Sequence, residues 1–163
     1  MGTRHVSGDP WPVEVDMAAA TVCYKGDFIV QSLADPQIGF PASNTVLHET
    51  SLAVIQALAH TSFIGIALED KVAGKAKAVQ VATEGIFEIP ITAAAAAVVG
   101  ALFGPDNSDG PAGHTAIVDQ RAILVATDTL AFGVLVQPTV AADTHAHIRI
   151  FGTKTTGGVK AMA

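Results

Sequence analysis

Two stretches of sequence decide the fold. Residues 63–68 read Phe-Ile-Gly-Ile-Ala-Leu, and residues 131–136, about 68 positions further on, read Ala-Phe-Gly-Val-Leu-Val. Each is followed by a polar link and then by a strand-like segment, at residues 78–81 and 146–150, in which apolar and polar side chains alternate. A segment that recurs in this way indicates an internal repeat.

The similarity extends upstream. Residues 25–30 (Lys-Gly-Asp-Phe-Ile-Val) have a looser counterpart in residues 99–103 (Val-Gly-Ala-Leu-Phe). Any two alternating strands look alike, but the shared aromatic-Gly-aliphatic steps favour a true repeat. We therefore predict two related β units, residues 25–90 and 99–151, packed on one core.

Short apolar runs separated by Gly, Pro, Asp and Thr occupy most of the chain outside these segments. Lys25-Gly26 is typical of a tight hairpin, and residues 147–150 (His-Ile-Arg-Ile) alternate with period two. This pattern predicts a mainly β fold over residues 20–152, a small β-barrel or β-tulip-like domain with one or two short helices. The remaining residues, 153–163, are expected to form a C-terminal tail.

Two segments are candidates for the helices. Residues 45–60 have apolar residues partly at helical spacing, with Asn44 or Thr45 as N-cap, although their Thr and Val content fits an extended segment nearly as well. Residues 92–99 are rich in alanine, the best helix former, and are bounded by Pro90 and Gly100. A helix and a strand both remain open for residues 92–99.

Residues 1–19 are predicted to form an extended N-terminal arm. Prolines on both sides of a tryptophan forbid a helix interior there. The candidate contact residues of the arm are Asp9, Pro10, Trp11, Pro12 and Val13. A lone Trp between prolines either packs back on its own domain or inserts into a neighbouring molecule, and the residues alone leave both open.

Composition narrows the function classes. Of the 163 residues, 50% are hydrophobic and only 15% charged, which excludes a disordered chain. The formal net charge of −6 argues against nucleic acid as a partner, because such binding relies on Lys and Arg. The longest apolar run, residues 93–103, is about half of the roughly 20 residues that a membrane span needs. The single cysteine, Cys23, forms no internal disulfide framework and is expected to be a small buried apolar side chain.

A search for catalytic motifs finds no phosphate-binding glycine loop and no Gly-x-Ser-x-Gly nucleophile elbow. No catalytic residue and no cofactor is therefore predicted. The best metal candidates are Asp143, His145 and His147, because the two histidines project to one face of a strand and a carboxylate could join them. The same spacing is common on solvated strand faces, so no metal site is assigned.

The order of the segments resembles the small capsid decoration, or cement, proteins of tailed bacteriophages. In particular it resembles a phage structural family formerly described as a domain of unknown function and sometimes mislabelled as a phage recombinase. The resemblance covers residues 20–152. Its most specific part is residues 79–90, which read Val-Gln-Val-Ala-Thr-Glu-Gly-Ile-Phe-Glu-Ile-Pro, after the strand at residues 63–68. The N-terminal arm, residues 43–60 and residues 105–113 look longer than the core of that family.

The resemblance implies a non-enzymatic β-rich protein that is commonly a homotrimer. It implies a virion protein, made in the host cytoplasm, that sits on the outer surface of the phage head and clamps neighbouring copies of the major capsid protein. Two other function classes remain open. One is a ligand- or metal-binding β module that uses the His145/His147 strand and residues 104–114; the other is a trimeric β enzyme with a site shared between subunits.

Overall fold

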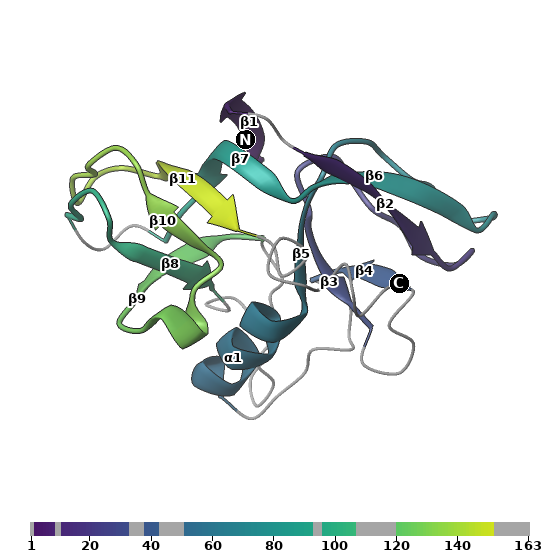
Figure 1. Ribbon diagram of the computed structural model, residues 1–163, viewed down its shortest axis with the longest axis horizontal. Coiled ribbons are helices and arrows are strands. Elements are labelled where there is room, and N and C mark those ends of the chain that lie inside the picture. The colour runs from purple at the N-terminus through teal and green to yellow at the C-terminus, as the bar shows by residue number, and fades with distance from the viewer. Residues whose placement is uncertain are drawn as a thin grey trace.

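Alternation of apolar and polar side chains builds the described strands of this protein, as one of them shows. In β11 (His145–Phe151), Ala146, Ile148 and Ile150 are buried, whereas Arg149 is exposed. The computed structural model describes residues 2–8, 11–32, 38–42, 51–92, 96–106 and 120–151. The strands among them form two antiparallel sheets, which lie side by side along the long axis of the molecule (Figure 1). The predicted mainly β fold class is confirmed.

The two sheets have six and five strands. The six-stranded sheet has the order β1-β7-β11-β10-β8-β9, and the five-stranded sheet has the order β2-β6-β5-β3-β4. The strands of the first are β1 (Arg4–Ser7), β7 (Glu84–Pro90), β8 (Leu102–Pro105), β9 (Ala122–Val125), β10 (Gly133–Leu135) and β11. The strands of the second are β2 (Pro12–Met17), β3 (Phe28–Gln31), β4 (Gly39–Pro41), β5 (Phe63–Ala67) and β6 (Lys77–Ala82).

Each sheet curls towards closure. In the five-stranded sheet a parallel bridge joins Asp16 in β2 to Ile38 beside β4. In the six-stranded sheet a parallel bridge joins Ile91, just after β7, to Ala122 in β9. One bridge is less than a full ladder of hydrogen bonds, so each sheet is barrel-like without being a closed barrel.

Apart from β1, the two sheets have the same strand order. Strands β2, β6, β5, β3 and β4 correspond in turn to β7, β11, β10, β8 and β9. The registers correspond as well, because Gly65 of β5 pairs with Ile29 and Gly133 of β10 pairs with Phe103. We call residues 12–82 unit 1 and residues 84–151 unit 2.

The boundary between the units differs from the one predicted from the sequence. The prediction assigned β7 to the first unit, ending at residue 90, but β7 pairs with β11 along its whole length and so belongs to unit 2. The chain passes from β6 to β7 through the single residue Thr83, which is buried. The sequence does not reveal this crossing from one sheet to the other, because a single residue that is not typical of turns separates two alternating segments.

The interiors of the two units use corresponding positions. The interior of unit 1 is a cluster of buried side chains: Val15, Met17, Cys23, Ile29, Ile64, Ala67, Val79 and Val81. The corresponding positions of unit 2 are all buried too: Ile89, Ile91, Ala97, Phe103, Phe132, Leu135, Ala146 and Ile148. The two barrels are therefore filled in the same way, by apolar side chains removed from water.

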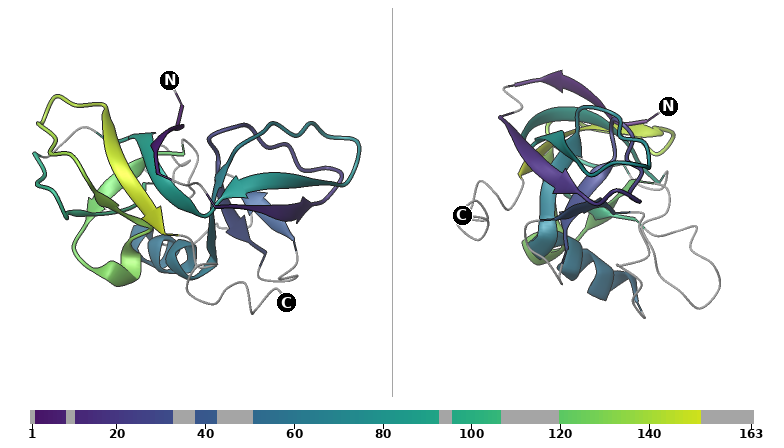
Figure 2. Two further views of the ribbon diagram at one scale, coloured as in Figure 1. Left: turned by 45° about the horizontal axis from the view of Figure 1, so that its top comes forward. Right: turned by 90° about the vertical axis from the view of Figure 1, so that its right-hand side faces the viewer.

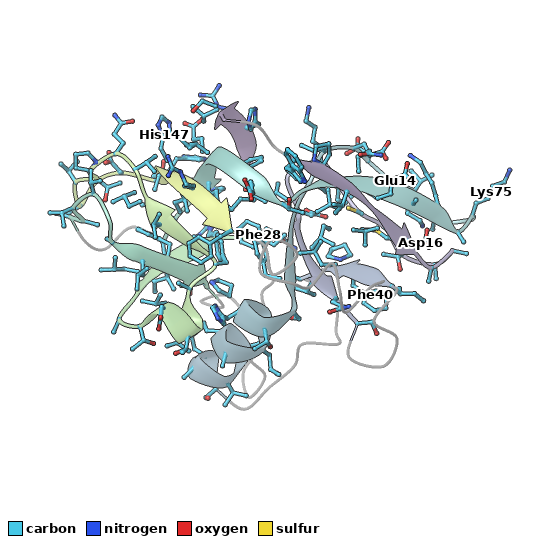
Figure 3. The ribbon with its side chains drawn as sticks, in the orientation of Figure 1. Glu14, Asp16, Phe28, Phe40, Lys75 and His147 are labelled. Atoms are coloured by element: carbon cyan, nitrogen blue, oxygen red, sulfur yellow. The ribbon has the colours of Figure 1, made fainter. Side chains whose placement is uncertain are left out.

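The interior of unit 2 is continuous with the outer face of unit 1. The Phe132 ring centroid lies 5.0 Å from that of Phe28 and 5.1 Å from that of Phe63, and both of these rings come from unit 1. Figure 3 shows Phe28 between the two sheets. One hydrophobic cluster thus joins the units.

The outer faces of the two units differ in burial. Ile66 and Ala82 on the outer face of unit 1 are buried in the cluster that joins the units. The corresponding residues of unit 2 are Val134, which is half-buried, and Arg149, which is exposed. The two units therefore pack asymmetrically, with the outside of one against the open interior of the other.

The helix α1 (Leu52–Ser62) seals this junction. It begins after Ser51, whose hydroxyl accepts a hydrogen bond from the Val54 amide at 3.4 Å, and it ends before β5. From α1, Gln56 donates to the Pro105 carbonyl at 3.0 Å, and His60 Nδ1 lies 2.6 Å from the Ala131 carbonyl oxygen. Both carbonyls belong to unit 2, so α1 binds one unit to the other.

The two segments predicted as helix candidates differ in outcome. The first, residues 45–60, holds a helix, which begins later, at Leu52; residues 45–50 lie outside the described residues. In the second, residues 93–95 lie outside the described residues, and Ala97 forms an antiparallel bridge with Thr139. The other short helix among the described residues is a 3-10 turn, η2 (Asp128–Leu130), between β9 and β10. Its place between β9 and β10 corresponds to the place of α1 between β4 and β5 in unit 1.

Residues 4–7 and 12–17 form edge strands of the two sheets rather than an arm clear of the domain. β1 pairs with β7, and β2 pairs with β6 along its whole length. Val15 and Met17 of β2 are 0% and 2% exposed. The predicted domain start at residue 20 thus leaves out a strand that the core of unit 1 requires.

Met17→Ala tests this position of β2. We expect the substitution to lower the free energy of unfolding by about 2–5 kcal/mol, because it empties part of the unit 1 interior. Asp16→Ala is the control and should change it by less than about 0.5 kcal/mol, since Asp16 is exposed. Urea unfolding followed by circular dichroism measures both. Equally small effects would place β2 outside the core.

Gly65 and Gly133 stand at corresponding points of close strand approach. A Cβ on Gly65 would lie 1.8 Å from the Ala82 carbonyl oxygen, and one on Gly133 would lie 2.7 Å from the Arg149 carbonyl oxygen. We expect Gly65→Ala to destabilise the protein by about 3 kcal/mol or more, because backbone must move. Gly2→Ala is the matched control, since a Cβ there has nothing within 4 Å. An unchanged urea midpoint for Gly65→Ala would contradict the close approach.

Candidate interaction surface

The predicted metal candidates lie together on and before β11, and one atom each of Asp143 and His145 has a local hydrogen-bond partner. The Asp143 carboxylate accepts a hydrogen bond from the Val140 amide at 2.8 Å and so closes a turn. His145 Nδ1 lies 3.0 Å from the Thr144 hydroxyl. Among the described residues, no group of three His, Cys, Asp or Glu side chains is arranged to hold a metal ion.

The face of β7 beside these histidines carries an ion pair. Glu88 of β7 is the register partner of His147, whose side chain is labelled on the surface in Figure 3. Arg4 of β1 donates a hydrogen bond to the Glu88 carboxylate, and this contact is the main cause that lowers the pKa of Glu88 below its usual value. The pair ties the edge strand β1 to the sheet, which is a structural role.

The candidate contact residues of the N-terminal segment are only partly exposed. Trp11 is 64% exposed, and its backbone has a positive φ of 41° and accepts a hydrogen bond from the Thr83 hydroxyl at 2.8 Å. Pro12 is exposed, whereas Val13 packs against the core of unit 1. Asp9 and Pro10 lie outside the described residues. The Trp11 backbone is therefore held beside the crossing between the two sheets, and its side chain is exposed there.

The strongest exposed apolar feature of unit 1 is a patch of Val22, Tyr24 and Val72, which we call the unit-1 patch. Their exposed fractions are 41%, 63% and 77%. Cys23 and Lys71 exchange backbone hydrogen bonds of 2.9 and 2.8 Å, and both point inward. Their neighbours along the two segments therefore point outward on the same face.

Buried polar chemistry holds the unit-1 patch in place. The Lys71 ammonium group, on a residue that is 3% exposed, donates to the Thr21 carbonyl oxygen at 2.6 Å. Burial, with the carboxylates of Asp27 and Asp70 adding to it, raises the pKa of the Cys23 thiol to about 12. Cys23 is thus a neutral core side chain and not a nucleophile.

Unit 2 has a patch at corresponding positions, formed by Val98, Val99 and Val140, which we call the unit-2 patch. Their exposed fractions are 75%, 60% and 61%. Ala97 and Thr139 exchange backbone hydrogen bonds of 3.1 and 3.0 Å, as Cys23 and Lys71 do in unit 1. Val98 corresponds to Tyr24, and Val140 corresponds to Val72.

The segments that carry the two patches lie at opposite ends of the molecule (Figure 1). The segments of unit 2 that carry its patch lie at the left-hand end of Figure 1 and of the left view in Figure 2, and the loop between β5 and β6 extends to the right-hand end. Sequence reasoning did not find either patch. The available signal was the presence of large apolar residues beside turn glycines, as in residues 98–100 (Val-Val-Gly) and 72–74 (Val-Ala-Gly).

No family model matches the chain, and no curated protein matches it by sequence. Among solved structures, the chain is similar to the head fiber gp8.5 N base of bacteriophage phi29. The identity is 14%, the match covers 85% of this chain and 93% of that chain, and the TM-score is 0.47. A likeness at this level identifies no functional residue. Among the described residues there is no helix that could span a lipid bilayer.

The geometry at β11 predicts that the protein does not bind zinc there. Titration calorimetry with zinc chloride should give the same heat for the wild type and for His145→Ala combined with His147→Ala. The reason is that the carboxylate needed as third ligand closes the Val140–Asp143 turn. Micromolar binding that is lost in the double variant would contradict this reading and assign a metal site to the face of β11.

Proposed function

We propose that this chain is a non-enzymatic capsid decoration (cement) protein of a tailed bacteriophage. In this proposal it assembles as a homotrimer and binds the outer surface of the phage head. There it stabilises contacts between neighbouring copies of the major capsid protein. Its place is the virion, with no cofactor, no direct nucleic-acid contact and no membrane partner.

The observation that carries the proposal is the pair of exposed apolar patches at corresponding positions of the two units. A protein that links several shell subunits needs separate contact surfaces for its own copies and for the shell. Tyr24 and Val72 in unit 1, and Val98 and Val140 in unit 2, are all at least 61% exposed. Apolar side chains gathered in this way mark protein contacts on soluble proteins.

The segment that carries the family resemblance supports the proposal from the sequence side. Residues 79–90 form most of β6 and all of β7, with the crossing at Thr83 between them. This segment supplies one strand to each unit and so fixes how the two units are joined. The resemblance therefore concerns the architecture of the protein rather than a local surface feature.

A protein that clamps shell subunits together depends on its own rigidity more than on the affinity of each single contact. A clamp transmits load between its contact surfaces, and here one continuous hydrophobic cluster joins unit 1 to unit 2. Each contact can be weak, because repetition over a symmetric shell makes modest affinities effective together. Trp11, exposed and fixed at its backbone, is proposed as a further contact residue.

Electron microscopy of phage heads prepared without this protein tests the proposal. Added purified protein should appear as extra density on the outer surface, and it should raise the temperature at which the heads release DNA. Trp11→Ala should weaken binding about ten-fold or more, as truncation of a buried interface Trp does. Asp16→Ala, on the exposed face of β2, should bind like the wild type.

Two results would count against the proposal. Absence of outer density at saturating wild-type protein would overturn the decoration function. Wild-type binding by the Trp11→Ala variant would remove Trp11 from the contact surface and leave the rest of the proposal standing.

A further inference from the structure

We propose that the unit-2 patch, Val98, Val99 and Val140, is the surface through which copies of this chain associate with one another. The occupant of the patch is thus a further copy of this chain, and in the proposed homotrimer the three patches meet around the three-fold axis. The inference rests on the proposed function in one respect, that several copies act together. What is new is the assignment of the contact between copies to one of the two patches.

Charge is the observation that separates the two patches. The segments that build the unit-2 patch, residues 96–101 and 136–142, contain no charged side chain, and the Asp143 carboxylate that follows them is half-buried and accepts a hydrogen bond from the Val140 amide. The whole chain has a net charge of −6, so copies repel one another over most of their surface. A contact between identical surfaces is least opposed where charge is absent, because like charges across a contact are costly.

The unit-1 patch carries charge where the unit-2 patch does not. Lys25 corresponds to Val99 and is exposed. Asp70, whose carboxylate accepts a hydrogen bond from the Lys25 amide at 2.7 Å, corresponds to Pro138. Lys75 projects from the same end of the molecule, as Figure 3 shows. A contact between copies through this patch would remove these charged side chains from water, which is costly.

The unit-2 patch is also held in a fixed shape. The Gly100 amide donates to the Leu135 carbonyl at 2.9 Å, and the Ala101 amide donates to the Val98 carbonyl at 3.0 Å. On the neighbouring segment, the Val140 amide donates to the Asp143 carboxylate at 2.8 Å. Valine side chains have few rotamers, so a contact here orders little that is not already ordered.

The molar mass in solution tests the inference, measured by light scattering after size exclusion and by sedimentation velocity. The wild type should have the mass of an oligomer at micromolar concentration. Val98→Asp combined with Val140→Asp should have the mass of a monomer, because each copy then brings two charges to the contact. Both positions begin hydrogen-bonded turns, where aspartate is well tolerated.

Tyr24→Asp combined with Val72→Asp is the matched control, because it makes the same change at the corresponding positions of unit 1. This variant should keep the mass of the wild-type oligomer. Circular dichroism and thermal unfolding should be similar for all three proteins, since the four substituted side chains are exposed.

The inference is overturned by a wild type that is monomeric at every concentration. It is also overturned by a Val98/Val140 variant that stays oligomeric, or by dissociation of the Tyr24/Val72 variant alone. These measurements contain no phage shell. Their failure is therefore distinguishable from failure of the decoration function, which is read from binding to heads.

Discussion

The contact of Phe132 with Phe28 and Phe63 is the interaction on which the rest of the structure depends. Neither barrel is closed by a full ladder, and the interior of unit 2 opens towards unit 1. The Phe28 and Phe63 rings cover that opening at centroid distances of 5.0 and 5.1 Å from Phe132. Tilted and edge-on ring contacts at such distances add to the gain from burial. Without this contact, unit 2 would expose its hydrophobic interior to water, and unit 1 would expose the apolar side chains of its outer face.

Different side chains fill corresponding interior positions of the two units. Ile29 and Ile64 of unit 1 are replaced in unit 2 by the larger Phe103 and Phe132, while Val79 is replaced by the smaller Ala146. Cores tolerate such exchanges when total volume and pattern are kept. The two units therefore share the positions of their buried side chains but not the residues at them. Glycines such as Gly65 recur where space allows no side chain.

Much of the fold could be predicted from the sequence, because alternation and turn residues are local signals. The mainly β class follows from them, and the glycine-centred segments lead to the strands β5 and β10. β2 was also visible, since residues 13–17 (Val-Glu-Val-Asp-Met) alternate, but the neighbouring prolines led to the prediction of an arm. The candidate surface was not predicted, because the valines beside turn glycines are a weak signal and the exposure of Val98 or Val72 depends on bridges between segments distant in the chain.

The asymmetric packing of the two units has a consequence for the outer face of unit 2. Packing the outside of one unit on the interior of the next is a head-to-tail arrangement, and head-to-tail arrangements that do not close continue as filaments. The outer face of unit 2 would be the place where a third unit adds. There, Arg149 stands at the position that Ala82 occupies in unit 1, and it is exposed. An exposed charged side chain is costly to bury without a partner charge, so this face differs from the apolar outer face through which unit 1 packs on unit 2.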